Sequence, residues 1–164
     1  MNEETLKAMA STNGDSVVVA RLKEKMRQCG GKSSIIMLGE GPIGIRLSPD
    51  GEGIIADFYR SLVMEWRIFD AIVNKANSLG GKMFKGDAMA QGGARIGSVD
   101  FPLDTIDAYI STSFYGSKIG GTATRKSTYY CAILSWADIV ENHRSEGKGS
   151  FIKVLAPFKR GEDW

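Results

Sequence analysis

The sequence has few of the residues on which catalytic and metal sites are often built: two cysteines and one histidine among 164 residues. Cys29 and Cys131 lie far apart in the chain and form no CxxC pair, so neither a zinc site nor a disulfide framework is indicated. Cys131 belongs to the apolar run 129–134, which predicts a small buried side chain. His143 stands in a polar segment with no GxSxG motif nearby, so we expect a solvated loop residue instead of a catalytic base.

Long apolar runs and a large excess of one charge are also lacking. No window approaches ~18 uninterrupted apolar residues, and the polar, acidic start of the chain is unlike a secretory signal. We therefore expect a cytoplasmic protein with no membrane partner. The apolar fraction is 43%, the charged fraction 24% and the net charge +2, which together describe an ordinary globular chain. The length predicts one compact domain over residues 1–164.

Nucleotide-binding motifs are missing as well, although the chain contains 20 glycines. Neither the stretch 39–41 nor the stretch 116–121 has a GxGxxG or GxxxxGK pattern. These glycines are better explained by turns, and we expect no cofactor.

The first sixty residues predict helices and one β-hairpin. A short helix is expected at 3–10, and a second helix starts at Asp15 or Ser16, either of which can cap it, and runs to Gln28. Its apolar stripe contains Val18, Leu22 and Met26. Two strand-like runs, 34–38 and 43–47, flank a Gly-Pro turn and predict the hairpin.

The rest of the chain alternates periodic and Gly-rich segments. Apolar spacing predicts three helices, at 61–79, 104–114 and 125–138. Residues 82–101 and 115–124 predict loops, the first with room for one short strand. Residues 139–142 and 151–155 predict a hairpin with its tip at 143–149. The predicted class is α+β, helix-rich, with a helix-plus-hairpin subregion over 1–60.

The element order over residues 61–156 resembles that of winged helix-turn-helix domains. In those domains a third helix lies in the major groove and a β-hairpin wing contacts the DNA backbone or the minor groove. The resemblance implies that 125–138 is the recognition helix and 139–155 the wing. The segment 125–155 also resembles the small winged-helix modules attached to restriction-type nucleases. The chain departs from the pattern at 80–101 and at 115–124, because both connections are longer than the motif needs.

The distribution of charge agrees with this resemblance. Residues 117–160 carry eight basic and three acidic side chains, a net charge of +5, whereas residues 1–116 carry a net charge of −1. A local positive excess is what phosphate binding requires, since each contact releases condensed counterions. We therefore predict non-catalytic binding of double-stranded DNA, as a regulator or as the recognition module of a defence or mobile-element system. The predicted DNA-binding residues are Lys118, Arg125, Lys126, Ser127, Thr128, Arg144 and Lys148.

Two other classes of function remain open. A Mg²⁺-dependent nuclease would use Asp50 with Glu146 and Lys148, since such sites combine two carboxylates and a lysine. Alternatively, the winged-helix half is an adaptor for a protein partner. The helix ending at Gln28 offers a homodimer contact through 17–22 or an extension of the DNA surface through its basic residues.

Overall fold

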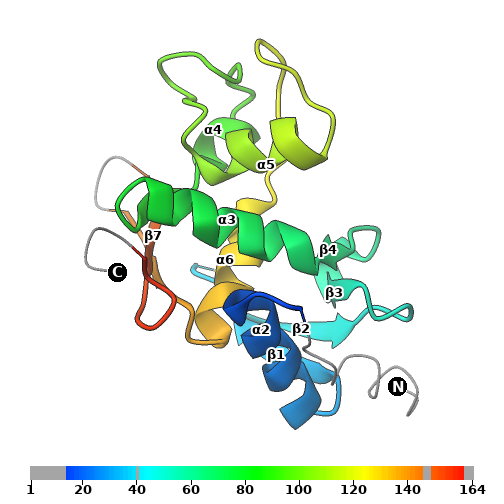
Figure 1. Ribbon diagram of the computed structural model, residues 1–164. Helices are drawn as coiled ribbons and strands as arrows, with labels where there is room; N and C mark the ends of the chain where they lie inside the picture. The colour runs from blue at the N-terminus through cyan, green and yellow to red at the C-terminus, as the bar shows by residue number, and fades with distance from the viewer. Residues whose placement is uncertain (1–13, 40, 146–148, 161–164) are drawn as a thin grey trace.

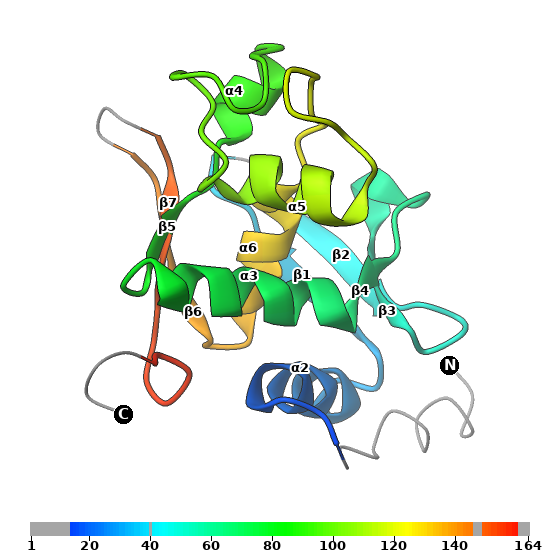
Figure 2. The same ribbon diagram turned by 45° about the horizontal axis from the view of Figure 1, so that its top comes forward.

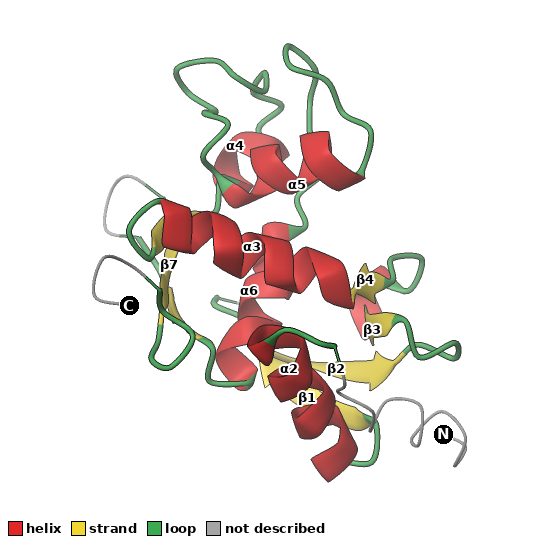
Figure 3. Cartoon of the chain, viewed as in Figure 1, coloured by secondary structure: helices red, strands yellow, loops and turns green. Residues whose placement is uncertain are grey.

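A computed structural model describes residues 14–39, 41–145 and 149–160, and Figures 1 and 3 show an α+β arrangement in which two antiparallel sheets lie on different sides of central helices. This confirms the predicted fold class. The helix expected at 3–10 lies outside the described residues. No helix in the described part of the chain is long and apolar enough to cross a membrane.

The first part of the fold is helix α2 followed by a four-stranded sheet. Helix α2 begins where the Ser16 hydroxyl accepts a hydrogen bond from the Val19 amide at 3.2 Å, so Ser16, of the two residues that the sequence offered, is the cap. The expected hairpin is confirmed, and two further strands extend it in the order β1-β2-β3-β4. The elements of this part are α2 (Val17–Gln28), β1 (Lys32–Ile36), β2 (Pro42–Leu47), β3 (Gly53–Ala56), a 3₁₀ turn (Asp57–Tyr59) and β4 (Met64–Glu65).

The second part contains the remaining helices and a three-stranded sheet. In this sheet β7 is central, and it pairs antiparallel with β5 on one side and β6 on the other. The predicted C-terminal hairpin is therefore present as β6 and β7. The elements are α3 (Trp66–Ser78), β5 (Lys82–Phe84), α4 (Asp87–Gln91), α5 (Ile106–Phe114), α6 (Ser127–Trp136), β6 (Val140–His143) and β7 (Phe151–Val154).

Two expectations about this part are wrong. The helix predicted at 61–79 begins only at Trp66, because Met64 pairs with Ile54 and Glu65 with Gly53 across the first sheet. The apolar spacing of 61–79 could not show this pairing, because it depends on backbone hydrogen bonds to residues outside that segment. The segment 82–101 contains β5, the short strand for which the sequence left room, and also the short helix α4, which was not predicted.

Helix α6 occupies the centre of the molecule. One apolar cluster joins α2, both sheets, α3 and α6. In Figure 2, α3 lies on one side of α6 and β1 on the other, and the ring of Phe69 on α3 packs 4.9 Å from that of Tyr130 on α6. Tyr130, Cys131, Ile133 and Leu134 are fully buried.

Candidate functional site

The start of α6 is held by a buried carboxylate on α5. Asp107 accepts hydrogen bonds from the backbone amides of Lys126 and Ser127, both at 2.9 Å, and from the Ser127 hydroxyl at 2.6 Å. The carboxylate thus satisfies amides that have no partner within the helix. Burial raises the pKa of Asp107 to about 6, and the hydrogen bonds from Ser127 and Lys126 oppose that rise. Asp107 therefore supplies the oxygen that caps the start of α6.

Helix α6 presents no exposed face. None of its ten residues is exposed, because β1, β6 and α3 pack around it. Thr128, one of the predicted DNA-binding residues, is buried, and Tyr129 and Ser135 are half-buried. A helix covered in this way cannot enter a major groove in this conformation. The expectation of an exposed recognition face is therefore wrong for this fold.

The predicted DNA-binding residues occupy different environments. Lys118 and Arg144 are exposed, and Arg125 is half-buried. Ser127 is buried by Asp107, and Lys126 is buried with its ammonium 4.4 Å from the centre of the Tyr115 ring. Burial lowers the pKa of Lys126, and the charge of Asp107 opposes that shift. Lys148 lies outside the described residues.

Three of these residues meet around one small cavity. Arg125 and Thr128 reach it from the start of α6, and Arg144 reaches it from the end of β6. The cavity volume is about 260 Å³, well above the ~30 Å³ share of one water molecule in the liquid. Its lining consists of Leu38, Gly39, Lys85, Asp87, Arg125, Thr128, Arg144 and Ser150.

Lys85 is the most unusual residue of this cavity, because only 1% of its surface is exposed. Its backbone links two elements: its amide donates to Ser150 at 2.9 Å, and its carbonyl accepts from Asp107 at 2.9 Å. Within the described chain, its ammonium group forms no hydrogen bond and no ion pair. A buried ammonium that makes no ion pair is costly, so this geometry favours an anion in the cavity in addition to the carboxylate of Asp87 in its lining.

Two further features point to the same cavity. The Thr128 side chain is 6% exposed, and its hydroxyl has no hydrogen-bond partner among the residues that the structure describes. The Arg144 guanidinium crosses to the turn after β1 and lies against Gly39, where any side chain would overlap it. The hairpin β6–β7, the β1–β2 turn and the start of α6 therefore converge at this point.

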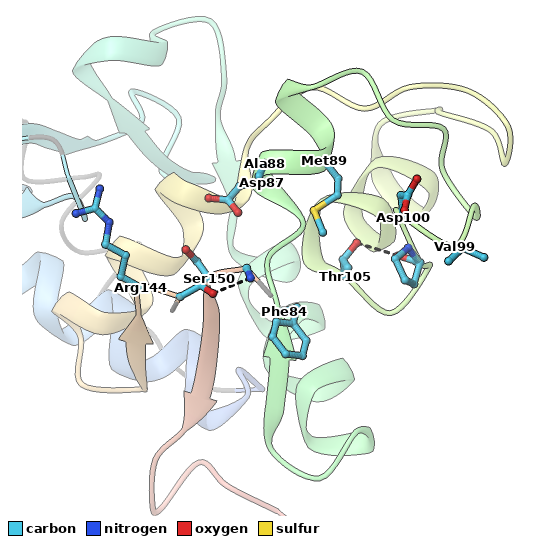
Figure 4. Close-up of a pocket in the computed structure, with 12 residues that line it drawn as sticks. Phe84, Asp87, Ala88, Met89, Val99, Asp100, Thr105, Arg144 and Ser150 are labelled. Carbon is cyan, nitrogen blue, oxygen red and sulfur yellow. Dashed lines mark hydrogen bonds between the residues drawn. The ribbon is translucent and has the colours of Figure 1, made fainter. Parts of the chain in front are cut away.

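A larger cavity of about 960 Å³ adjoins the first and shares Asp87, Arg144 and Ser150 with it. Figure 4 shows Arg144, Asp87 and Ser150 toward one end of this cavity and Val99 and Asp100 toward the other. The remaining wall is partly apolar and is contributed by β5, α4 and the loop before α5. Its apolar lining consists of Phe84, Ala88, Met89, Val99 and Pro102.

Asp50, which the nuclease hypothesis uses, does not line either cavity. Asp50 accepts from the Ser48 hydroxyl at 2.7 Å and from the Glu52 amide at 3.0 Å, so it shapes the β2–β3 turn, and the Ser48 bond is the largest cause of its lowered pKa. Glu146 lies outside the described residues, so the nuclease pairing stays a prediction. The described residues contain no group of three or more metal-ligating side chains.

His143 and Cys131 both make contacts with neighbouring side chains or lie in the core. The His143 ring stacks on Phe151 with ring centres 4.8 Å apart and pairs with Glu141 at 2.7 Å. Cys131 is fully buried, as predicted, and burial raises the pKa of its thiol to about 12. Neither residue lines the two cavities.

Lys85 is the innermost of the site residues that the sequence prediction missed, and Asp87, Ser150 and Asp107 are the others discussed above. Lysine side chains are almost always exposed, so a lone lysine in a Gly-rich stretch draws no attention. The feature that could have indicated its burial is the alternation of side chains along β5. Lys82 and Phe84 are exposed and Met83 is buried, and the same alternation continued by one residue buries Lys85.

Comparison with protein-family models, curated proteins and solved structures found no match. The case for a function therefore rests on the geometry of the site.

Proposed function

We propose that this protein binds double-stranded DNA by contacting phosphates with the surface where the β6–β7 hairpin meets the start of α6. The observation that carries the proposal is the meeting of Arg125 and Arg144 at one cavity. The sequence had assigned these two cations separately, one to the third helix and one to the hairpin. Their convergence gives the local positive charge that phosphate contacts use.

The element order supports the same proposal. Helices α3, α5 and α6, followed by the β6–β7 hairpin, occur in the order of the three helices and the wing of winged helix-turn-helix domains. Strand β5 lies beside β7 and completes a sheet at the base of the hairpin. A wing of this kind contacts the DNA backbone or the minor groove, and Arg144 stands at its end.

The buried state of α6 changes the expected mode of binding. Because none of its residues is exposed, α6 has no side chain with which to read base edges in this conformation. Binding through Arg125, Arg144 and the exposed Lys118 would be dominated by phosphates. We therefore expect an affinity that varies little with base sequence and falls steeply with salt.

Fluorescence anisotropy with a labelled duplex tests this proposal. Wild-type protein is expected to bind at about 50 mM salt, and the double variant Arg125→Ala/Arg144→Ala is expected to bind at least about tenfold more weakly. Arg60→Ala is the matched control, because Arg60 is exposed on the link between β3 and β4. Absence of binding by the wild type, or equal losses in the double variant and the control, would overturn the proposal.

A protein-interaction role is the second candidate function, and one observation favours it. Val99 is 96% exposed and Ile119 is 68% exposed, on two loops that are paired by hydrogen bonds between Ile96 and residues 120 and 121. Exposed apolar side chains on loops that hydrogen-bond to each other are compatible with a contact surface. Sedimentation of wild type and Val99→Ser/Ile119→Ser distinguishes self-association through these loops from a monomer.

A further inference from the structure

We infer that the cavity around Lys85 binds a phosphate monoester and that the adjoining larger cavity holds the nucleoside attached to it. The ligand would be the phosphorylated end of a nucleic-acid strand or a free nucleotide. Its identification as a strand end rests on the proposed function, whereas the phosphate chemistry rests on the cavity alone.

Lys85 and Thr128 are the two most buried polar side chains of the cavity. In each of them the polar group that would bind phosphate has no partner among the described residues. The Lys85 ammonium has no ion pair within the described chain, and the Thr128 hydroxyl has no hydrogen bond there. An ammonium and a hydroxyl are both donors, so both are satisfied by phosphate oxygens. The backbone amides of Lys126 and Ser127 already donate to Asp107, so the helix end has no free amides there for a phosphate. The side chains of Lys85 and Thr128 would bind it instead.

The described residues of the lining carry more positive than negative charge. Among them Lys85, Arg125 and Arg144 are cationic and Asp87 is anionic. A phosphate monoester carries about −1.5 to −2 charges at neutral pH, whereas each backbone diester carries one. The excess of cations therefore favours the terminal group.

Access gives the second reason to prefer a monoester. Only 1% of Lys85 is exposed, so a phosphate must enter the cavity to reach it. A backbone phosphate is linked to sugars on both sides and cannot leave the duplex surface, whereas a terminal phosphate is linked on one side only.

The larger cavity suits the attached nucleoside. It shares Asp87, Arg144 and Ser150 with the phosphate cavity, so a ligand can occupy both at once. Its volume of about 960 Å³ is within the usual ~300–1,000 Å³ of ligand sites. Phe84 and Met89 in its wall provide an aromatic ring and a polarizable thioether, against which a base can pack.

The test compares one oligonucleotide duplex with 5′-phosphate and with 5′-hydroxyl ends, and adds a nucleoside monophosphate and inorganic phosphate as separate arms. Wild-type protein is expected to bind the phosphorylated duplex at least about tenfold more tightly. Lys85→Met should remove this preference, because it keeps the length and removes the charge. Thr128→Val, which deletes a hydroxyl without a partner, should reduce the preference without loss of stability. Lys32→Met, at the exposed start of β1, is the matched control.

The outcomes separate the two proposals. Equal affinity for both duplex ends, unchanged in Lys85→Met and Thr128→Val, overturns the monoester site and leaves duplex binding standing. Binding of the monophosphate that is lost in either variant, in a protein that does not bind duplex, supports the cavity and overturns the proposed function. If Lys85→Met does not fold, the end preference of wild type and of Thr128→Val decides the question. Inorganic phosphate should compete with the phosphorylated end only, and competition with both ends equally contradicts the inference.

Discussion

Asp107 determines where α6 begins, although it lies about twenty residues earlier in the chain. Its carboxylate receives both backbone amides at the helix start and the Ser127 hydroxyl, all within 2.9 Å. This contact also places Arg125 and Thr128 at the mouth of the cavity. A single buried side chain thus connects local backbone structure to the candidate site.

The raised pKa of Asp107 makes a prediction about stability and pH. The pKa rises from 3.8 to about 6 on folding, mainly because the carboxyl is buried. The folded state therefore holds the proton more tightly than the unfolded chain, and the stability this provides is lost as pH rises from about 4 to about 6. Relative to Asp107→Asn, the wild-type free energy of unfolding should fall by up to about 3 kcal/mol over that range. Urea denaturation at several pH values measures this difference, and a flat or rising difference contradicts the assignment.

Gly86 makes a second prediction at this scale, because it separates Lys85 from Asp87. Its φ is +71°, and a methyl group there would lie 2.7 Å from Thr105 and 2.8 Å from Phe101. Gly93 has a similar φ of +76° but open space around it. Gly86→Ala should therefore destabilise the protein by about 1–3 kcal/mol more than Gly93→Ala. Both variants have the same backbone strain, so the difference between their stabilities in thermal denaturation measures the steric clash at Gly86. Equal losses of stability would contradict the described packing.

At the scale of elements, the first sheet covers the helix that the sequence assigned to DNA. Strand β1 packs against α6 and alternates along its length, with Ile35 1% exposed and Ile36 77% exposed. Because the sheet packs on it, α6 is part of the core of the molecule and has no solvent-exposed face.

This packing predicts opposite results for two neighbouring isoleucines. Ile35→Ala should cost about 2–5 kcal/mol of stability, because it leaves a cavity in the core. Ile36→Ala should change stability by no more than about 0.5 kcal/mol, because its side chain faces solvent. Equal effects in chemical denaturation would mean that β1 is shifted by one residue relative to α6.

The depth of α6 also predicts the reactivity of the two thiols. Cys131 is fully buried, and burial raises the pKa of its thiol to about 12, whereas Cys29 is half-buried at the end of α2. In native protein a thiol reagent should modify Cys29 and leave Cys131 unmodified, and in denaturant it should modify both. Cys29→Ser should then give no rapid native reaction. Rapid modification of Cys131 would show that α6 is accessible.

At the scale of the whole molecule, much of the element order follows from local patterns in the sequence. Ser16 and the stripe from Val18 to Met26 define α2, and the apolar run around Tyr130 defines α6. Glycine and turn residues mark both hairpins. These signals are local, so one sequence suffices to find them.

Contacts between separate segments could not be predicted in the same way. Met64 and Glu65 join the first sheet through residues 53 and 54, and Asp107 caps a helix that starts at Ser127. The burial of Lys85 likewise depends on contacts of β5 with β7 and α5. For this reason the candidate site was predicted in part, through Arg125, Thr128 and Arg144, while its innermost lysine was not.

The salt dependence of duplex affinity tests the central claim most directly. If the surface at the hairpin and α6 binds DNA through phosphates, the logarithm of affinity falls linearly with the logarithm of salt concentration. Arg144→Ala should weaken binding to all duplex sequences alike and reduce that slope by about 1. The contradictory result is a wild-type protein that does not bind duplex at low salt, or a slope that Arg144→Ala and Arg125→Ala leave unchanged.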